Sequence, residues 1–427
     1  MRVLFLCEIF DPGVGSSVRQ MYQEAERLRA LGHQTAVVSC TQDPAEAGET
    51  EIEGTTVFCI HSDYALRWRA WVALKNRRVV APLERILANW KPDVVHAHLI
   101  HSHLGYHSLT QARAAGAGVV FTAHDVMVFC YQKLTCFHGG EAHGGLLRDY
   151  PAYIGKCIPC QRLRFRPGRN RVIRAVLERD VHRFTVVSDE LGVAIRANRI
   201  RVDRTIYNAT RPQRELPGPE AVRAFRERLG LGDALVIAIG GRLHEQKGVG
   251  KLFEMLAALA PRFPDLRLLV MGKRELYERE FEPRARALGI VERVVPTGWL
   301  AGEALALAYS AADVFVTPSI CFDTFGLVNL EAMEHAKPVV ATVFGGSKEV
   351  VEDGVTGFVA NPFDVPAYAE KIALLLTDSA LRERMGAAGR ERWLAHFTIE
   401  RLTAEFLEEY RLAIEMAEAG ATSRARK

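Results

Sequence analysis

Residues 235–248 read LVIAIGGRLHEQKG, and this stretch decides how the C-terminal half of the chain is expected to fold. Residues 235–239 form a short apolar run, which is typical of a strand buried on both faces of a parallel sheet. Two glycines and two cations follow, and a helical pattern begins after them. A strand, a glycine-rich turn and a helix in this order make one unit of a doubly wound α/β sheet.

The same alternation of short apolar runs and helical stretches extends in both directions. A Pro-rich segment, 208–220 (NATRPQRELPGPE), interrupts it and is typical of a linker. Two runs of alternation predict an α/β protein of two doubly wound, Rossmann-like domains facing a central cleft. The expected strands are 3–7, 35–39, 57–60, 93–98, 119–123 and 185–188 before the linker, and 235–239, 266–271, 294–297, 314–317, 339–342 and 357–360 after it.

The domain boundaries follow from this pattern. We expect an N-terminal domain over 1–207 that contains a cysteine-bearing loop, 130–160. A linker and crossover over 208–232 precede a second domain over 233–395. The last residues, 396–427, form one long helical pattern, for which packing back onto the first domain is an open alternative.

The composition excludes several classes of protein. The 427 residues carry 55 Lys and Arg against 51 Asp and Glu, and a net charge of +4 is too small to indicate nucleic-acid binding. No apolar run approaches the roughly 18 residues of a membrane span. The apolar start ends at Glu8, which is too early for a signal peptide. We therefore expect a cytoplasmic protein whose eight cysteines are mostly reduced.

Three loops after expected strands carry polar chemistry in the C-terminal half. The first contains Gly241, Arg242 and Lys247, and two cations near a helix N-terminus suit a diphosphate. A solvated glycine turn would give the same pattern. The second, 318–331 (PSICFDTFGLVNLE), places Asp323 and Glu331 around a helix start, where carboxylates can accept sugar hydroxyls. The third contains paired glycines followed by an acid, at 345, 346 and 349.

In order and spacing, these motifs resemble the donor domain of the retaining family 4 glycosyltransferases, which have the GT-B fold. The resemblance covers residues 235–359. It is carried by Gly241-Arg242, Lys247-Gly248, Phe325-Gly326-Leu327, Glu331-Ala-Met333, residues 338–342 and Gly345-Gly346 with Glu349.

The resemblance implies roles for these residues. Arg242 and Lys247 would bind the donor diphosphate, Glu331 the ribose hydroxyls, and Asp323 the transferred sugar. The backbone around Gly241 and the N–H groups of Phe325, Gly326 and Leu327 would lie near the phosphates and sugar. Two positions depart from the family: Asp323 replaces a glutamate that is longer by roughly 1.5 Å, and Ala336 replaces a glycine.

The N-terminal half offers fewer specific signals. Gly13 and Gly15 occupy the place of the family's glycine-rich loop, although a tight strand-to-helix turn would look the same. His124 and Asp125 end an expected strand where the family carries a histidine near the donor sugar and acceptor. His98 is expected on the acceptor side as well. With this resemblance, the residues expected in catalysis are His124, Asp323, Arg242 and Lys247.

Two groups of residues raise the question of a metal. The histidine run from His96 to His107 suggests one, but the family has a similar run without using a metal. Four cysteines leave three readings open: a structural zinc, a labile disulfide or unlinked thiols. They are Cys130, Cys136, Cys157 and Cys160.

Two stretches are strongly basic. Residues 67–78 combine five cations with two tryptophans on an expected helix, and residues 162–174 contain six arginines. Such segments can contact an anionic membrane, or can simply form solvated helix faces.

Taken together, the sequence predicts a retaining glycosyltransferase that needs no catalytic cofactor. It has no Asp-x-Asp motif for a catalytic metal. The expected partners are a UDP-, GDP- or ADP-sugar and a glycan or lipid-linked acceptor in polysaccharide or glycoconjugate synthesis. The location would be cytoplasmic, with peripheral contact to the inner membrane face as an option. The alternatives are a nucleotide-sugar epimerase, a phosphorylase, or a non-catalytic sugar-nucleotide-binding protein.

Overall fold

The computed structural model describes residues 1–11, 15–212 and 215–425. The chain forms two compact units. The N-terminal unit comprises Met1–Leu134, Tyr150–Ala209 and Ile399–Lys427, and the C-terminal unit comprises Thr135–Asp149 and Thr210–Thr398.

The N-terminal unit is built on an eight-stranded sheet with the order β3-β4-β2-β1-β5-β6-β7-β8. All neighbouring strands are parallel except β3, which pairs antiparallel with β4. The order reverses between β1 and β5, so the loops after these strands lie at the switch point where α/β sheets bind ligands. The strands are β1 (Arg2–Leu6), β2 (Gln34–Thr41), β3 (Gly48–Ile52), β4 (Thr55–His61), β5 (Val94–Ala97), β6 (Gly118–Ala123), β7 (Arg183–Val186) and β8 (Arg204–Thr205).

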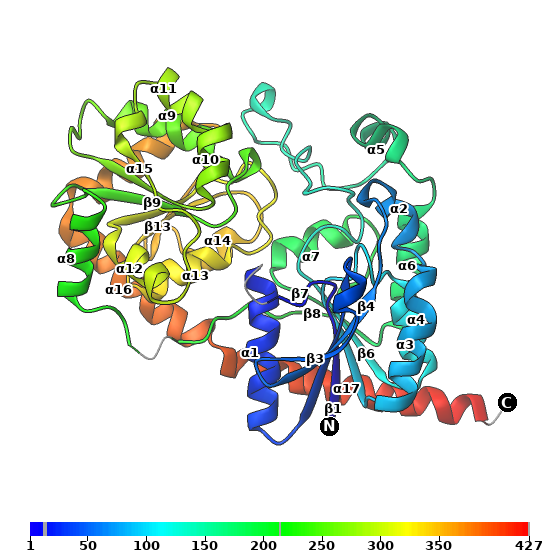
Figure 1. Cartoon of the computed structure of the whole chain (residues 1–427). Coiled ribbons are helices and arrows are strands. Elements are labelled where there is room, and N and C mark those ends of the chain that lie inside the picture. The colour runs from blue at the N-terminus through cyan, green and yellow to red at the C-terminus, as the bar shows by residue number, and fades with distance from the viewer. Residues whose placement is uncertain (12–14, 213–214, 426–427) are drawn as a thin grey trace. The chain divides into compact units, whose positions relative to one another are not determined.

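Helices cover both faces of this sheet, with α1 and α17 together on one face and α3, α4 and α6 on the other (Figure 1). The core under α1 and α17 is formed by apolar side chains of β1, β2 and these two helices. The helices are α1 (Ser16–Ala30), α2 (Arg69–Val72), α3 (Arg77–Trp90), α4 (His107–Ala114), α5 (Ile154–Gln161), α6 (Arg169–Asp180), α7 (Asp189–Arg196) and α17 (Ile399–Ala425).

The C-terminal unit contains a wholly parallel sheet of six strands with the order β11-β10-β9-β12-β13-β14. Its order reverses between β9 and β12, so the expected phosphate and sugar loops both begin at the switch point. The strands are β9 (Val236–Gly240), β10 (Arg267–Met271), β11 (Val294–Pro296), β12 (Val314–Thr317), β13 (Val339–Thr342) and β14 (Gly357–Ala360).

Helices α9, α11 and α15 lie on one face of the second sheet, and α8, α12, α13 and α16 lie on the other (Figure 1). The helices of this unit are α8 (Pro219–Arg228), α9 (Val249–Leu259), α10 (Arg274–Glu280), α11 (Glu282–Ala287), α12 (Gly302–Ala311), α13 (Leu327–Glu334), α14 (Ser347–Val350), α15 (Val365–Thr377) and α16 (Ser379–His396).

The predicted fold class is confirmed, and each expected apolar run contributes to a strand. The units divide after residues 209 and 398, close to the expected 207 and 395, and α17 packs against α1 and β6 of the N-terminal unit. The sequence did not predict β3, because GETEI is an exposed edge strand without an apolar face. A tight turn at Glu53 and Gly54, both with positive φ, folds it back onto β4.

Residues 135–149 correct the expected domain boundary, since they belong to the C-terminal unit rather than to the first domain. The Phe137 ring packs edge-on against Phe322 and Phe344, at centroid distances of 5.6 and 5.5 Å. Lys251 Nζ also lies 2.7 Å from the Glu141 carboxylate. These aromatic and ionic contacts join the segment to the second unit.

Two further expectations need correction. Residues 67–78 do not form one helix: η2 (Leu66–Trp68) and α2 are short, and α3 starts after Asn76, whose side chain accepts a hydrogen bond from the Arg78 N–H. The cysteines also do not all lie in a loop, because Cys157 and Cys160 are on α5.

Candidate donor-binding site

The loop after β9 is fixed against the loop after β12. Gly248 has φ = 76°, and a Cβ atom there would lie 1.8 Å from the Pro318 carbonyl oxygen, so only glycine fits. The backbone N–H groups of Ile320 and Cys321 donate to the Gln246 carbonyl at 3.0 and 3.2 Å. The two loops therefore form one rigid surface at the end of the sheet.

Lys247 and Asp323 meet on this surface. Lys247 Nζ lies 3.1 Å from Asp323 Oδ2, which also accepts a 3.0 Å hydrogen bond from the Ser319 hydroxyl. The Asp323 side chain is 7% exposed, whereas Lys247 is 35% exposed. Burial lowers the pKa of Lys247, but the nearby Asp323 carboxylate and the Cys321 thiol raise it by more, so its pKa lies above the ordinary value. Lys247 is therefore a fixed, partly accessible cation.

Arg242 stands beside this pair but is more accessible. Its side chain is exposed and, within the described part of the chain, makes no hydrogen bond or ion pair with another residue. Its positive charge acts on Lys247, where it lowers the pKa. Two cations this close favour an anionic ligand.

The third loop positions the backbone of Asp323. Gly346 N–H donates to the Asp323 carbonyl at 2.7 Å. A Cβ atom on Gly345, which has φ = 78°, would lie 2.0 Å from the same carbonyl oxygen. The paired glycines after β13 thus allow the close approach that holds Asp323 in place.

Helix α13 begins next to this acid, with Gly326 as its N-cap residue. Buried Asn329 and Ser347 lie against Gly326, and Asn329 Oδ1 accepts a hydrogen bond from Thr317 at 3.0 Å. In the described ranges, Asn329 Nδ2 and Ser347 Oγ have no hydrogen-bond partner. Sequence reasoning did not select either residue, and their place beside the helix start makes both candidate ligand contacts.

Glu331 is positioned from the neighbouring helix. Tyr309 on α12 donates its hydroxyl hydrogen bond to Glu331 Oε2 at 2.6 Å, and His335 contacts the Glu331 carbonyl at 2.8 Å. The ring of Phe325 is buried and packs edge-on against Phe397. Tyr309 was not predicted, because its sequence context, GEALALAYSA, carries no functional signal.

In the N-terminal unit, the expected histidines form a buried pair. His98 Nδ1 lies 2.8 Å from His124 Nε2, and the two rings are stacked with centroids 5.1 Å apart. Burial lowers the pKa of His124 to about 4 and that of His98 well below the ordinary value. Both rings are therefore neutral near pH 7, so one donates its proton to the other. Asp125, which is 31% exposed, lies 3.3 Å from His101.

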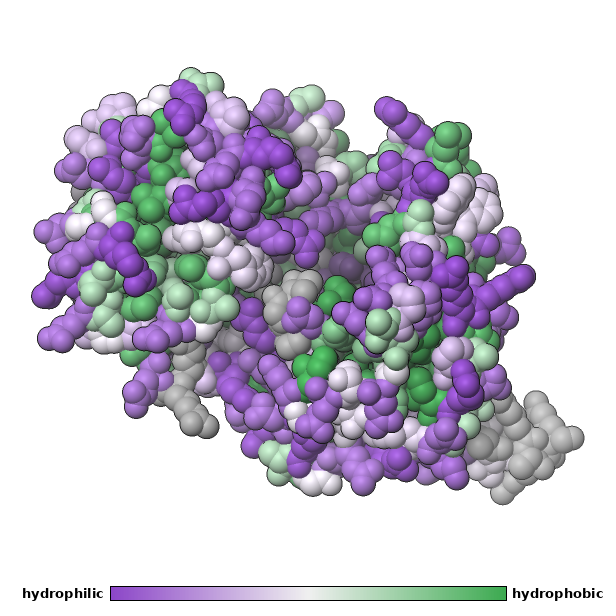
Figure 2. All heavy atoms as spheres, in the orientation of Figure 1, coloured by the Kyte–Doolittle hydropathy of each residue, from purple (hydrophilic) through white to green (hydrophobic). Residues whose placement is uncertain are grey.

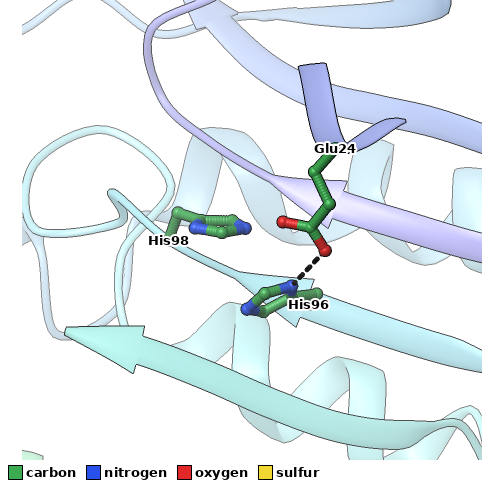
Figure 3. A group of neighbouring side chains, drawn as sticks. All are labelled: Glu24, His96 and His98. Carbon is green, nitrogen blue, oxygen red and sulfur yellow. Dashed lines mark ion pairs between the residues drawn. The ribbon is translucent and has the colours of Figure 1, made fainter. Parts of the chain in front are cut away.

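Behind this pair lies a cluster of fully buried polar groups, Glu24, His96 and His98, whose nearest ligand atoms fall within 4.8 Å of one another (Figure 3). Glu24 Oε1 lies 3.9 Å from His96 Nδ1 and accepts a 2.6 Å hydrogen bond from Tyr410 on α17. Burial raises the pKa of Glu24 to about 8, although the Tyr410 hydrogen bond lowers it.

Hydrogen bonds connect the members of this cluster to neighbouring side chains. Both nitrogens of His96 have partners at 2.7 Å, Tyr410 and Thr122. Of the side-chain atoms of Glu24, His96 and His98, two have no hydrogen-bond partner within the described part of the chain: Glu24 Oε2 and His98 Nε2. The network links α1, β5 and α17 and extends through His98 to His124.

The remaining candidate residues are the glycines of the N-terminal loop and the four cysteines. Gly15 is the N-cap residue of α1, which begins at Ser16, and Gly13 lies outside the described residues. Cys130, Cys157 and Cys160 belong to the N-terminal unit and Cys136 to the other. In the ranges that the structure covers, the one group of three candidate metal ligands is Glu24, His96 and His98. The four-cysteine zinc site stays a prediction.

Two family profiles match the chain. "Glycosyltransferase Family 4" matches residues 17–214, and "Glycosyl transferases group 1" matches residues 222–392. The chain belongs to the family 4 glycosyltransferases. The second profile spans the Lys247–Asp323 surface, and the first spans the His98–His124 pair.

The chain is also similar to curated proteins. The GDP-mannose-dependent alpha-(1-6)-phosphatidylinositol monomannoside mannosyltransferase of Mycolicibacterium smegmatis is 37% identical over 41% of this chain and 47% of its own length, so the chain matches about half of that relative. Spore coat protein SA of Bacillus subtilis is 27% identical over 93% of this chain and 96% of its own length.

The solved structures support the same fold. The sucrose-phosphate synthase of Thermosynechococcus elongatus superimposes with a TM-score of 0.75 at 22% identity, covering 96% of this chain and 98% of that one. The chain therefore has the GT-B fold. No helix within the described ranges is both long and apolar enough to cross a membrane.

Proposed function

We propose that this protein transfers a hexose-type sugar from a nucleoside diphosphate sugar to a hydroxyl acceptor with retention of anomeric configuration. The observation that carries the proposal is the Lys247–Asp323 pair, held at the switch point by three glycine-containing loops with Arg242 beside it. The leaving diphosphate gains negative charge as its bond to the sugar breaks. Fixed cations and helix N-terminal amides stabilise such charge without reorganisation.

Each residue has a distinct part in this proposal. Lys247 and Arg242 contact the diphosphate, and Asp323 holds Lys247 while its carboxylate faces the sugar. Glu331, oriented by Tyr309, accepts the ribose hydroxyls. Because the shorter Asp323 already engages Lys247 and Ser319, its first effect on catalysis is to position the cation.

On the acceptor side, the neutral His98–His124 pair supplies hydrogen-bonding groups for sugar hydroxyls. We propose that the departing phosphate takes the acceptor proton, and that Lys247 and Arg242 neutralise the diphosphate in place of a catalytic metal. The acceptor we favour is lipid-linked or a glycan of the cell surface. The Mycolicibacterium relative is by name a phosphatidylinositol monomannoside mannosyltransferase, which supports this choice.

A thermal-shift screen in EDTA tests the donor site. UDP, GDP, ADP and their sugar conjugates are added to the full chain, because a ligand that binds only the folded state raises Tm by mass action. We expect one nucleoside diphosphate to raise Tm in the wild type and in Arg262→Ala, and much less in Arg242→Ala. No shift with any of these ligands would contradict the proposal.

Product analysis separates the alternatives. Turnover that requires an added acceptor and yields the donor's anomeric configuration by NMR supports a retaining transferase. Donor consumption without acceptor would indicate an epimerase, a requirement for phosphate would indicate a phosphorylase, and binding without turnover would indicate a binding protein.

A further inference from the structure

The two basic segments noted in the sequence meet in the N-terminal unit. The Arg166 guanidinium lies over the Trp71 ring, 4.9 Å from its centroid. Arg69 donates to the Tyr131 carbonyl at 2.6 Å, and the Tyr131 hydroxyl donates to the Arg166 carbonyl at 2.9 Å. Segments about 90 residues apart in sequence are thus joined through Tyr131 into one surface that carries α2 and α5 (Figure 1).

Large apolar side chains are exposed on this surface. Leu163 is 96% exposed and Ile154 is 67% exposed, which is unusual for aliphatic residues on a protein that needs no partner there. In Figure 2, hydrophobic side chains stand beside strongly hydrophilic ones over α5. The exposed apolar residues of the two segments are Leu66, Trp68, Trp71, Tyr153, Ile154, Ile158 and Leu163.

The charged residues of the two segments that carry these side chains are all positive. Residues 64–83 contain five Lys and Arg, residues 150–177 contain seven, and neither stretch contains an Asp or Glu. A chain with a net charge of only +4 therefore concentrates cations here. Each Lys or Arg close to an anionic membrane surface contributes favourably to binding, and this attraction weakens with salt.

The mixture of residues favours lipid over other anionic partners. Tryptophan and tyrosine side chains are enriched where the bilayer meets water, with their rings at headgroup level. Exposed Ile and Leu would gain by entering the acyl boundary but would gain nothing from phosphates of a nucleic acid. On α5, Ile154 and Ile158 are spaced i, i+4 and so project from one side of the helix.

We propose that this surface, residues 66–72 and 153–164 with the flanking arginines, docks the protein on an anionic lipid surface. The apolar side chains enter the interface while the arginines contact lipid phosphates. The proposal does not depend on glycosyl transfer, and its measurement is separate from nucleotide binding.

Vesicle flotation with the full-length protein tests the proposal. We expect the protein to float with vesicles of 70% phosphatidylcholine and 30% phosphatidylglycerol in low salt, but not with pure phosphatidylcholine or in 0.5 M NaCl. Ile154→Glu combined with Leu163→Glu, and separately Arg162→Glu combined with Arg164→Glu, should each weaken binding tenfold or more.

Matched controls change similar residues elsewhere. Leu374→Glu replaces an exposed leucine on α15, and Arg262→Glu replaces an exposed arginine near it in the same unit. Both controls should float like the wild type, and all variants should keep the wild-type Tm and far-UV circular dichroism spectrum, which shows that they fold. Absence of flotation, equal binding to both vesicle types, or binding that both double variants retain would overturn the proposal.

Discussion

In the C-terminal unit, Lys247 and Asp323 form an ion pair at a strand end where the lysine is about one third exposed. In the N-terminal unit, Glu24, His96 and His98 lie at a corresponding switch point but are fully buried. The first environment keeps groups charged through pairing and partial solvation. The second removes water from them, so that burial drives the acid and the imidazoles toward their neutral forms.

The two sheets have similar winding, but the groups at their switch points differ in charge and in access to water. The C-terminal site can attract a diphosphate because its charge is fixed and accessible. The N-terminal cluster holds hydrogen-bond donors and acceptors with little charge, and it reaches toward a ligand only through the His98–His124 pair, for which we propose contact with sugar hydroxyls. The variants below test each side of this contrast.

The largest expected effect is on turnover after loss of the fixed cation. Lys247→Ala should lower kcat about 10²- to 10³-fold, and Arg242→Ala about 10²-fold, because each removes a charge that stabilises the leaving diphosphate. Steady-state kinetics with the nucleotide sugar found in the screen measures both. Lys251→Ala, on α9 four residues after Lys247, serves as the control. Near-normal kcat in both variants would refute the phosphate assignment.

The next largest effect concerns the acid that holds this cation. Asp323→Asn keeps the side-chain size but removes the charge partner of Lys247 and should lower kcat about 10- to 100-fold, as expected for a hydrogen bond to a charged group. Asp323→Glu should retain more activity than the asparagine variant. If Asp323→Asn were as active as the wild type, the lysine would not need its carboxylate partner.

The buried cluster predicts a pH dependence of stability. The folded protein keeps a proton on Glu24 up to about pH 8, whereas an unfolded glutamate loses it near 4.5, so this contribution is present at low pH and is lost as the pH rises through 8. Between pH 6.5 and 8 the contribution of Glu24 to the free energy of unfolding should fall by about 2 kcal/mol, measured as the difference between the wild type and Glu24→Gln, because buried histidines with lowered pKa values, such as His98 and His124, act in the opposite direction in both proteins.

Urea unfolding at the two pH values measures this loss. Glu24→Gln should remove most of it, because glutamine does not titrate. Glu26→Gln, on the exposed side of the same helix, should behave like the wild type. Equal pH dependence in Glu24→Gln and the wild type would mean that Glu24 is ionised in the folded protein.

The smallest expected effect tests the orientation of Glu331. Tyr309→Phe removes the 2.6 Å hydrogen bond and should raise the donor KM about fivefold, equivalent to about 1 kcal/mol, with little change in kcat. Tyr277→Phe, a buried tyrosine on α10, is the control. An unchanged KM would place the ribose away from Glu331.

The sequence predicted the parts of the site that short-range chemistry specifies. Gly241, Arg242, Lys247, Asp323 and Glu331 were found because strand, glycine and charge follow one another locally. Tyr309, Asn329 and Ser347 were missed, since each reaches the site from a segment whose own pattern indicates only a helix or a turn. Glu24 was missed for the same reason: on an amphipathic helix, one of two glutamates looks solvated until the packing of α17 covers it.

The two parallel sheets follow from the sequence by itself, because short apolar runs that alternate with helical stretches bury both faces of each strand when helices cover a parallel sheet. Tertiary structure alone decided which unit receives residues 135–149, how the two basic segments join through Tyr131, and which acids lose their charge. These outcomes depend on contacts between residues distant in sequence, and burial and pairing are properties of such contacts rather than of any local pattern.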